Sequence, residues 1–193
     1  MQKLPRRFYA RPTLRVARDL LGKYFVRRTG NHVLVGKIVE VEAYLGSEDA
    51  ASHAFRGKTR RNEVMFGKAG HLYVYFTYGM HFCANIVTGA EGTAGAVLIR
   101  GIEPLKGRGV MERNRSRGGR VPTNLTNGPA RFCEAFGIGR NENGADLLGP
   151  VIYLTHGEDL PASKSRASTR VGIRAAREKK WRYFLPGNAC VSR

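Results

Sequence analysis

One long run of strand-forming residues, HVLVGKIVEVEAYL at positions 32–45, constrains the fold more than any other stretch of the sequence. It is rich in β-branched residues, which favour extended backbone. A shorter run of the same kind, YFVRR at positions 24–28, precedes it, and the intervening Thr29, Gly30 and Asn31 are typical turn residues. We therefore expect two antiparallel strands joined by a tight turn.

Further strand-like runs continue this pattern. Residues 71–87 predict a second strand pair that turns at Gly79, and AVLIR predicts a short strand that ends at Arg100. Later strands are predicted in VIYLTH, STRVGI and RYFL, at positions 151–156, 168–173 and 182–185.

Two helices are expected between these strands. One follows Thr13 and stops at Gly22, and the other starts at Gly128-Pro129 and stops at Gly137. The mixture predicts an α+β fold in a single domain, 1–193. We expect a curved antiparallel sheet with surrounding helices and a protruding β-hairpin.

The charge of the chain is strongly positive. Lys and Arg total 33 and Asp and Glu total 15, so the net charge is +18. Such an excess indicates a polyanionic partner, and nucleic acid is favoured because no apolar run is long enough to span a bilayer. Residues 106–120, KGRGVMERNRSRGGR, are expected to form a mobile basic loop, or a helix end and a loop. The basic N-terminus lacks the apolar stretch of a secretory signal, which favours a cytoplasmic protein.

The cysteines do not indicate a metal site. Cys83, Cys133 and Cys190 lie far apart, without Cys-x-x-Cys spacing, and are expected to be buried thiols. A zinc-dependent base deaminase is disfavoured, because its His-x-Glu and Pro-Cys-x-x-Cys signature is absent.

Acidic residues gather in the second half of the long strand. Alternate side chains point to opposite faces, so Glu40, Glu42 and Tyr44 share one face. This face is either a solvated outer surface, a general base in a cleft, or a pair of carboxylates that bind Mg²⁺ in a nuclease. The residues alone leave the three interpretations open. The following SEDAASH predicts a short helix capped by Ser47, with His53 near its end.

Aromatic residues dominate the second strand pair. Tyr73 fits a core position, and Tyr75 needs a partner for its hydroxyl if it is buried. Tyr78 precedes Gly79, where the chain can turn, so we expect Tyr78 to project. A projecting aromatic side chain can separate neighbouring base pairs from the minor groove, while other aromatics stack on the extruded base. Basic residues, aromatics and a carboxylate together indicate chemistry on a flipped nucleotide.

Several blocks of sequence closely resemble the alkyladenine (3-methyladenine) DNA glycosylase family: EVEAYLG, RNEVMF, LYVYFTYGMHFCANIV, VLIRGIEPL, GPARFCEAFGI and RVGI, in this order. The resemblance implies a monofunctional hydrolase of base excision repair that removes 3-methyladenine, 7-methylguanine, hypoxanthine or ethenoadenine. It implies a monomer that acts on double-stranded DNA with a damaged purine and uses no metal or other cofactor. Without the long N-terminal extension of mammalian members, the chain resembles a bacterial one.

The same resemblance implies roles around the water nucleophile. Glu42 matches the general base that activates water, and Arg100 matches a group that holds this water. The main-chain carbonyl of Val191 matches a second such group.

Residues that contact the base are implied in the same way. Tyr44, His53 and Tyr75 match the walls that stack on the flipped base, and the His53 backbone N–H matches a donor to it. Tyr78 matches the residue wedged into the duplex. Asn85 matches the residue that crowds the 2-amino group of guanine.

The sequence departs from the family at three places. His81 stands where an aromatic is common, Arg60 replaces a frequent proline, and residues 106–120 align only loosely. A non-catalytic minor-groove nucleic-acid-binding protein is the alternative function. It explains the charge and the wedge, but it leaves Glu42 and Tyr44 without a role.

Overall fold

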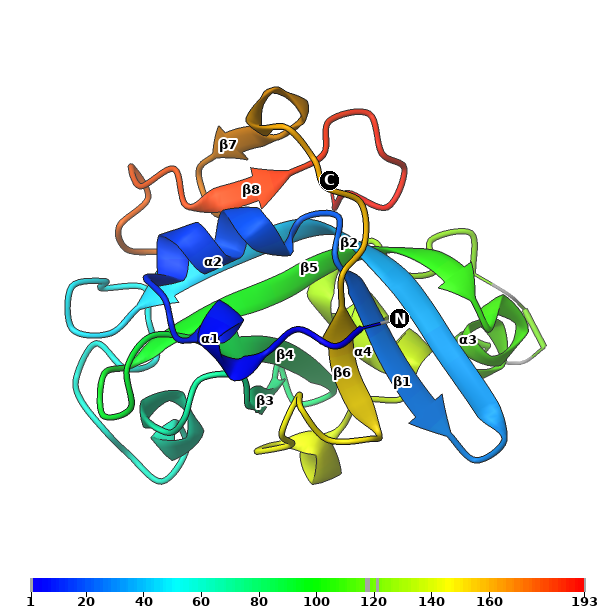
Figure 1. Cartoon of the computed structure of the whole chain (residues 1–193), viewed down its shortest axis with the longest axis horizontal. Coiled ribbons are helices and arrows are strands. Elements are labelled where there is room, and N and C mark those ends of the chain that lie inside the picture. Colours follow the sequence, from blue (N-terminus) through cyan, green and yellow to red (C-terminus); the bar gives the residue numbers. More distant parts are fainter. Residues whose placement is uncertain (1, 117–118, 121, 193) are drawn as a thin grey trace.

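The computed structural model describes residues 2–116, 119–120 and 122–192. Over these residues an antiparallel sheet of eight strands organises the chain, with short helices beside it (Figure 1). The hydrogen-bonded order is β3-β4-β5-β2-β1-β6, and β8 joins β2 on one side and β7 on the other. The strands are β1 (Tyr24–Thr29), β2 (His32–Leu45), β3 (Leu72–Thr77), β4 (His81–Val87), β5 (Gly95–Lys106), β6 (Ile152–Thr155), β7 (Arg166–Ser168) and β8 (Arg182–Phe184).

Helices pack on the sheet and complete the core. They are α1 (Arg6–Tyr9), α2 (Thr13–Leu20), α3 (Arg108–Arg115) and α4 (Pro129–Phe136), with 3-10 turns η1 (Glu63–Phe66), η2 (Arg140–Glu142) and η3 (Ala162–Lys164). α2 contacts β2 and β5, and α4 contacts β4 and β5. Phe25 of β1 makes edge-to-face contacts with Phe132 and Phe136 of α4, at 5.1 and 5.5 Å between ring centroids. The predicted α+β fold with a curved antiparallel sheet is confirmed.

β2 is the central strand, and its position determines the surroundings of the acidic residues. It pairs with β5 along most of its length. Its other edge pairs first with β1 and then, at Glu40, Val41 and Glu42, with β8. Strands on both edges and packing on both faces leave the middle of β2 without contact with solvent.

A bulge in the β2–β5 ladder orients Arg100. Glu40 pairs with Gly101 and Val41 pairs with Ile99, so Arg100 has no partner residue on β2. A bulge of this kind bends the strand and re-aims the extra side chain. The Arg100 guanidinium consequently lies between the carboxylates of Glu40 and Glu42.

The helix predictions are confirmed where local signals are strong. α2 starts at Thr13 and its last residue is Leu20. α4 starts at Pro129, whose fixed φ suits the first helical position, and ends before Gly137, which has a φ of 66°.

Other local predictions are wrong or incomplete. β5 does not end at Arg100, because pairing with β2 carries it through Pro104 to Lys106. Only Ser168 of STRVGI belongs to a strand. Residues 106–120, predicted as a basic loop or as a helix end and a loop, contain the last residue of β5 and then α3, and positions 117, 118 and 121 lie outside the described residues.

The segment after β2 forms turns instead of the predicted helix. Asp49 does not remain at a helix start. Its carboxylate accepts hydrogen bonds from the Leu45 and Ala51 backbone N–H groups and pairs with Arg170. A long-range ion pair has therefore overridden the local capping signal. No helix in the described residues is long and apolar enough to cross a membrane.

Candidate active site

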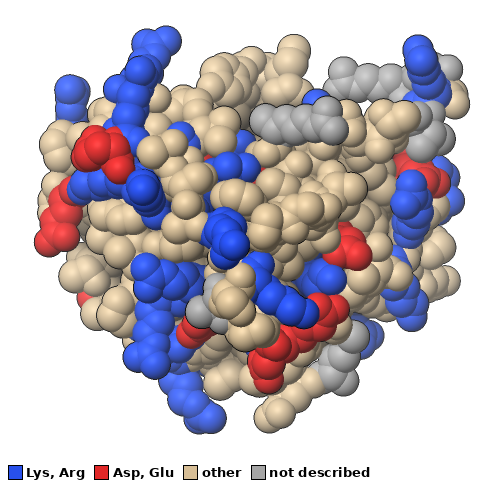
Figure 2. All heavy atoms as spheres, turned by 90° about the horizontal axis from the view of Figure 1, so that it is seen from above, with Lys and Arg blue, Asp and Glu red and all other residues tan. Residues whose placement is uncertain are grey.

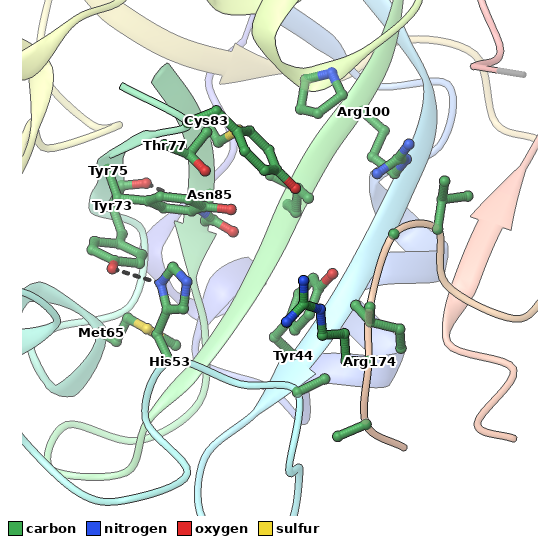
Figure 3. Close-up of a pocket in the computed structure, with 18 of the residues that line it drawn as sticks. Tyr44, His53, Met65, Tyr73, Tyr75, Thr77, Cys83, Asn85, Arg100 and Arg174 are labelled. Carbon is green, nitrogen blue, oxygen red and sulfur yellow. Dashed lines mark hydrogen bonds between the residues drawn. The ribbon is translucent and has the colours of Figure 1, made fainter. Parts of the chain in front are cut away.

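A cavity of about 370 Å³ opens between the β3–β4 hairpin and the end of β2 (Figure 3). Its volume is within the range of small-molecule sites. Elements far apart in sequence enclose it: the end of β2, the following loop, the hairpin, β5 and the segment 171–175. Lining residues include Tyr44, His53, Met65, Tyr73, Tyr75, Tyr78, Cys83, Asn85, Leu98, Arg100, Val171 and Arg174.

Three rings form the wall on the hairpin side. The ring centroids of His53 and Tyr75 are 4.4 Å apart, and those of Tyr73 and Tyr75 are 5.6 Å apart. His53 Nδ1 and the Tyr73 hydroxyl oxygen form a hydrogen bond of 3.0 Å, so Tyr73 belongs both to the core and to the wall. Asn62 fixes the loop by donating to the His53 carbonyl oxygen at 2.8 Å. These contacts hold the three rings in place.

This wall carries no formal charge near neutral pH. Burial and, secondly, the positive charge of Arg61 lower the pKa of His53, so its ring is neutral. Burial raises the pKa of Tyr73 to about 12 and that of Tyr75 well above its ordinary value, so both phenols stay protonated. Neutral aromatic rings attract a planar base and attract a cationic base more strongly.

Tyr44, at the end of β2, lies across the cavity from His53 (Figure 3). Its hydroxyl donates a hydrogen bond of 2.8 Å to Glu42 Oε2. Burial and, secondly, the charge of Glu42 raise the pKa of Tyr44 far above its ordinary value, so it remains a donor. The Arg170 guanidinium carbon lies 4.6 Å from the centre of the Tyr44 ring.

Glu42 lies directly behind Tyr44, which forms the opposite wall of the cavity, and it has no exposed area. Oε2 accepts the Tyr44 hydroxyl, Oε1 accepts the Val171 backbone N–H at 2.7 Å, and Arg100 Nε is 3.5 Å from Oε1. Tyr44, Arg100 and Val171 line the cavity, whereas Glu42 does not. The interpretation of this face as a solvated surface is wrong, because its carboxylate is enclosed one side chain away from the cavity.

Glu40 is equally buried but is engaged elsewhere. Its Oε1 accepts hydrogen bonds from Arg100 at 3.1 Å and from Arg182 at 2.6 Å, and its Oε2 accepts the Ser192 backbone N–H at 2.5 Å. Two guanidinium groups would repel a magnesium ion at this position. The contacts favour a structural anchor for Arg100 and the C-terminal segment over a metal ligand.

The structure brings Asn85 to the cavity but leaves Val191 outside it. Asn85 Nδ2 donates to the Tyr73 carbonyl oxygen at 3.1 Å, which fixes its side chain. Val191 precedes Ser192, whose hydroxyl contacts Arg100, but Val191 is not a lining residue. Val171 is the valine whose backbone reaches Glu42.

Tyr78 projects from the tip of the hairpin with 86% of its surface exposed. Its φ is 51°, in the left-handed region that residues with a side chain seldom occupy, and that of Gly79 is 68°. A bulky residue in this conformation costs backbone energy, which is tolerated mainly at functional positions. Met80 beside it is 66% exposed, so the tip offers an apolar wedge.

Sequence reasoning missed four residues around the cavity. Asp49 and Arg170 form a buried ion pair behind Tyr44, Val171 contacts Glu42, and Arg174 lies at the cavity next to Tyr44 (Figure 3). Arg170 and Val171 belong to the RVGI block, whose apolar residues had suggested a strand, and Asp49 belongs to the segment predicted as a short helix.

Basic side chains outnumber acidic ones on the face that carries β7 and β8 (Figure 2). Figure 2, which shows the side that carries β7 and β8, has Lys and Arg spread across the face and around its edge, with fewer Asp and Glu between them. A spread of this kind suits contacts with many phosphates.

The chain is similar to known proteins over almost its whole length. The family model described as methylpurine-DNA glycosylase matches residues 7–189. A protein of Carboxydothermus hydrogenoformans is 50% identical over 191 residues, 98% of each chain. One of Chlorobium phaeovibrioides is 48% identical over all of this chain and 97% of its own length. One of Burkholderia lata is 46% identical over 98% of this chain and 90% of its own. Each carries the name "Putative 3-methyladenine DNA glycosylase".

Proposed function

The chain belongs to the methylpurine-DNA glycosylase family, and from this premise we propose that it removes damaged purines from duplex DNA with Glu42 as general base. Membership of the family makes it a DNA-repair hydrolase of N-glycosyl bonds. The observation that carries the mechanism is the placement of one enclosed carboxylate directly behind a cavity with aromatic walls.

The reaction breaks the bond between purine N9 and C1′ of deoxyribose. The electron pair leaves with the purine, and positive charge develops on the sugar. The oxygen of water forms the new bond to C1′, and Glu42 takes the proton of that water. The negative carboxylate also stabilises the developing positive charge. Tyr44, Arg100 and Val171 border the cavity at Glu42, so we place the water among them. This proposal assigns no role to Val191.

The cavity walls suit a purine that has left the helix. We place the flipped base between Tyr44 on one side and His53 and Tyr75 on the other, with Asn85 at its edge. Tyr78 fills the gap in the duplex. Alkylation at N3 or N7 makes the base cationic, and a cation on an aromatic face gains about 0.5–2 kcal/mol. Stacking therefore favours 3-methyladenine and 7-methylguanine over neutral hypoxanthine and ethenoadenine.

One assay separates the proposal from its alternatives. A duplex with a single hypoxanthine is incubated with the protein in EDTA and then treated with hot alkali. The proposal expects strand breaks at the lesion only after alkali, because the glycosylase leaves an abasic site. Retarded but intact DNA indicates a non-catalytic binder. Breaks that need no alkali and form only in a parallel incubation with Mg²⁺ and without EDTA indicate a nuclease. Either of these results overturns the proposal.

A further inference from the structure

The buried ion pair of Asp49 and Arg170 lies immediately behind the cavity. Both side chains have 0% exposure. The pair is bidentate, with Oδ2 to one guanidinium nitrogen at 2.6 Å and Oδ1 to another at 2.8 Å. A buried pair of this kind seldom stabilises a fold more than apolar side chains of the same volume. Its presence therefore calls for a role besides stability.

The pair fixes the backbone on both sides of Tyr44. Arg170 donates to the Ala43 carbonyl oxygen at 3.0 Å, and Asp49 accepts the Leu45 backbone N–H at 3.2 Å. The Arg170 guanidinium also packs over two rings, with its central carbon 4.6 Å from the centre of the Tyr44 ring and 5.1 Å from that of the Trp181 ring. Tyr44 thus has little freedom to move away from Glu42.

The second donor to Glu42 depends on the same pair. Val171 follows Arg170 directly in the chain, and its backbone N–H donates to Glu42 Oε1 at 2.7 Å. Oε2 takes its hydrogen bond from Tyr44. Each oxygen of the carboxylate is therefore held by a residue whose backbone is fixed by Asp49 and Arg170.

We propose that the Asp49–Arg170 pair is a positioning device that holds the two hydrogen-bond donors of Glu42 and sets the place of the Tyr44 wall. This inference rests on the proposed role of Glu42 as general base. The pair does not touch the substrate, and neither of its residues forms or breaks a bond in the reaction. It acts through Tyr44 and Val171.

Several charged or titratable groups around Glu42 can influence how the reaction rate depends on pH. These groups are Glu40 and Tyr44 from β2, Cys83 from β4, Arg100 from β5, Arg182 from β8 and Arg170. The double variant below changes Arg170 and its partner Asp49 and leaves the other groups as they are, so a change in the pH profile reports the loss of the pair.

Two variants test the inference. Asp49→Asn removes one charge and leaves Arg170 buried without its partner, which endangers folding. Asp49→Asn/Arg170→Gln removes both charges at once, so no unpaired charge remains inside. The matched control is Arg27→Gln/Glu142→Gln, a pair of 2.9 Å between β1 and η2, with side chains 12% and 19% exposed. Its residues do not line the cavity.

The measurement is single-turnover release of hypoxanthine from a fully bound duplex, followed from pH 5 to pH 9. We expect the double variant to bind the duplex as wild type does. Its rate at pH 7 should be lower by about tenfold or more, because a small displacement of the groups at the reacting centre slows a reaction by at least this factor. The acidic limb of its profile should move to higher pH, since donors to a carboxylate favour its charged form. The control should keep the wild-type profile.

Wild-type rate and profile in the double variant would overturn the inference, and so would an equal slowing in the control. Failure of the proposed function looks different. In that case the wild type releases no base, or Glu42→Gln reacts as fast as wild type.

Discussion

At the scale of single residues, the site depends on how one carboxylate is enclosed. Glu42 is fully buried, yet three of its neighbours, Tyr44, Arg100 and Val171, border the cavity. Charged side chains are buried only with partners, and here a phenol, a backbone N–H and a guanidinium supply them. These partners compensate for the water that the buried carboxylate has lost.

Tyr44→Phe tests the hydroxyl of Tyr44 separately from its ring. The variant keeps the stacking face but removes the donor to Glu42 Oε2. We expect the rate of base release to decline at a higher pH than in wild type as the solution is acidified, with a smaller difference at pH 8. The measurement is the pH dependence of single-turnover release of 7-methylguanine. An unchanged profile would contradict a role for this hydroxyl at Glu42.

At the scale of elements, the β3–β4 hairpin provides one wall of the cavity and the exposed tip. The tip turns through two residues with positive φ, Tyr78 and Gly79. Glycine accepts such a backbone without strain, whereas tyrosine does not. The turn itself therefore does not explain a tyrosine at position 78, whereas a contact of its side chain with another molecule does.

Tyr78→Asn removes the aromatic side chain with a residue that suits the left-handed backbone at this position. Asparagine tolerates a left-handed conformation, so the hairpin should keep its shape while the wedge is lost. We expect release of hypoxanthine from duplex DNA to fall on the order of tenfold, because opening the stack costs a few kcal/mol. Release from single strands, where no stack has to be opened, should change little.

The comparison of the two substrates provides the test. A control variant, Val151→Ser, alters a side chain that is 54% exposed and does not line the cavity. It should leave both rates unchanged. Equal loss on single and double strands in Tyr78→Asn would contradict the wedge.

Local sequence patterns predicted the strands and helices better than the long-range contacts between residues. The alternation in residues 32–45 placed Glu42 and Tyr44 on one face, and their hydrogen bond confirms this. The pairing of Asp49 with Arg170 spans 121 residues, and no local pattern encodes a contact of that range. Tertiary pairing also decided the length of β5, which continues through Pro104.

At the scale of the whole molecule, the net charge of +18 is the dominant property. On the face shown in Figure 2, Lys and Arg are scattered and do not form one continuous strip. Each phosphate contact contributes about −0.9 to the slope of log K against log salt concentration. Binding to duplex DNA should therefore weaken steeply with salt.

Arg174 is a specific candidate for one of these contacts. It lies at the cavity and, within the described residues, forms no ion pair (Figure 3). We expect Arg174→Ala to reduce the slope by about one phosphate contact, equally for every lesion. The control is Arg28→Ala. Arg28 is exposed on β1 and pairs with Val33, at the end of β2 opposite to Tyr44. The measurement is duplex affinity across a range of salt concentrations. An unchanged slope in Arg174→Ala would contradict the assignment.

The central claim is that the Glu42 carboxylate activates the attacking water, and Glu42→Gln tests it most directly. Glutamine keeps the shape but cannot take the proton or stabilise positive charge on the sugar. With enzyme in excess over a duplex that contains 7-methylguanine, we expect unchanged affinity and base release slower by about 10² or more. Base release at the wild-type rate from an equally bound duplex would contradict the account.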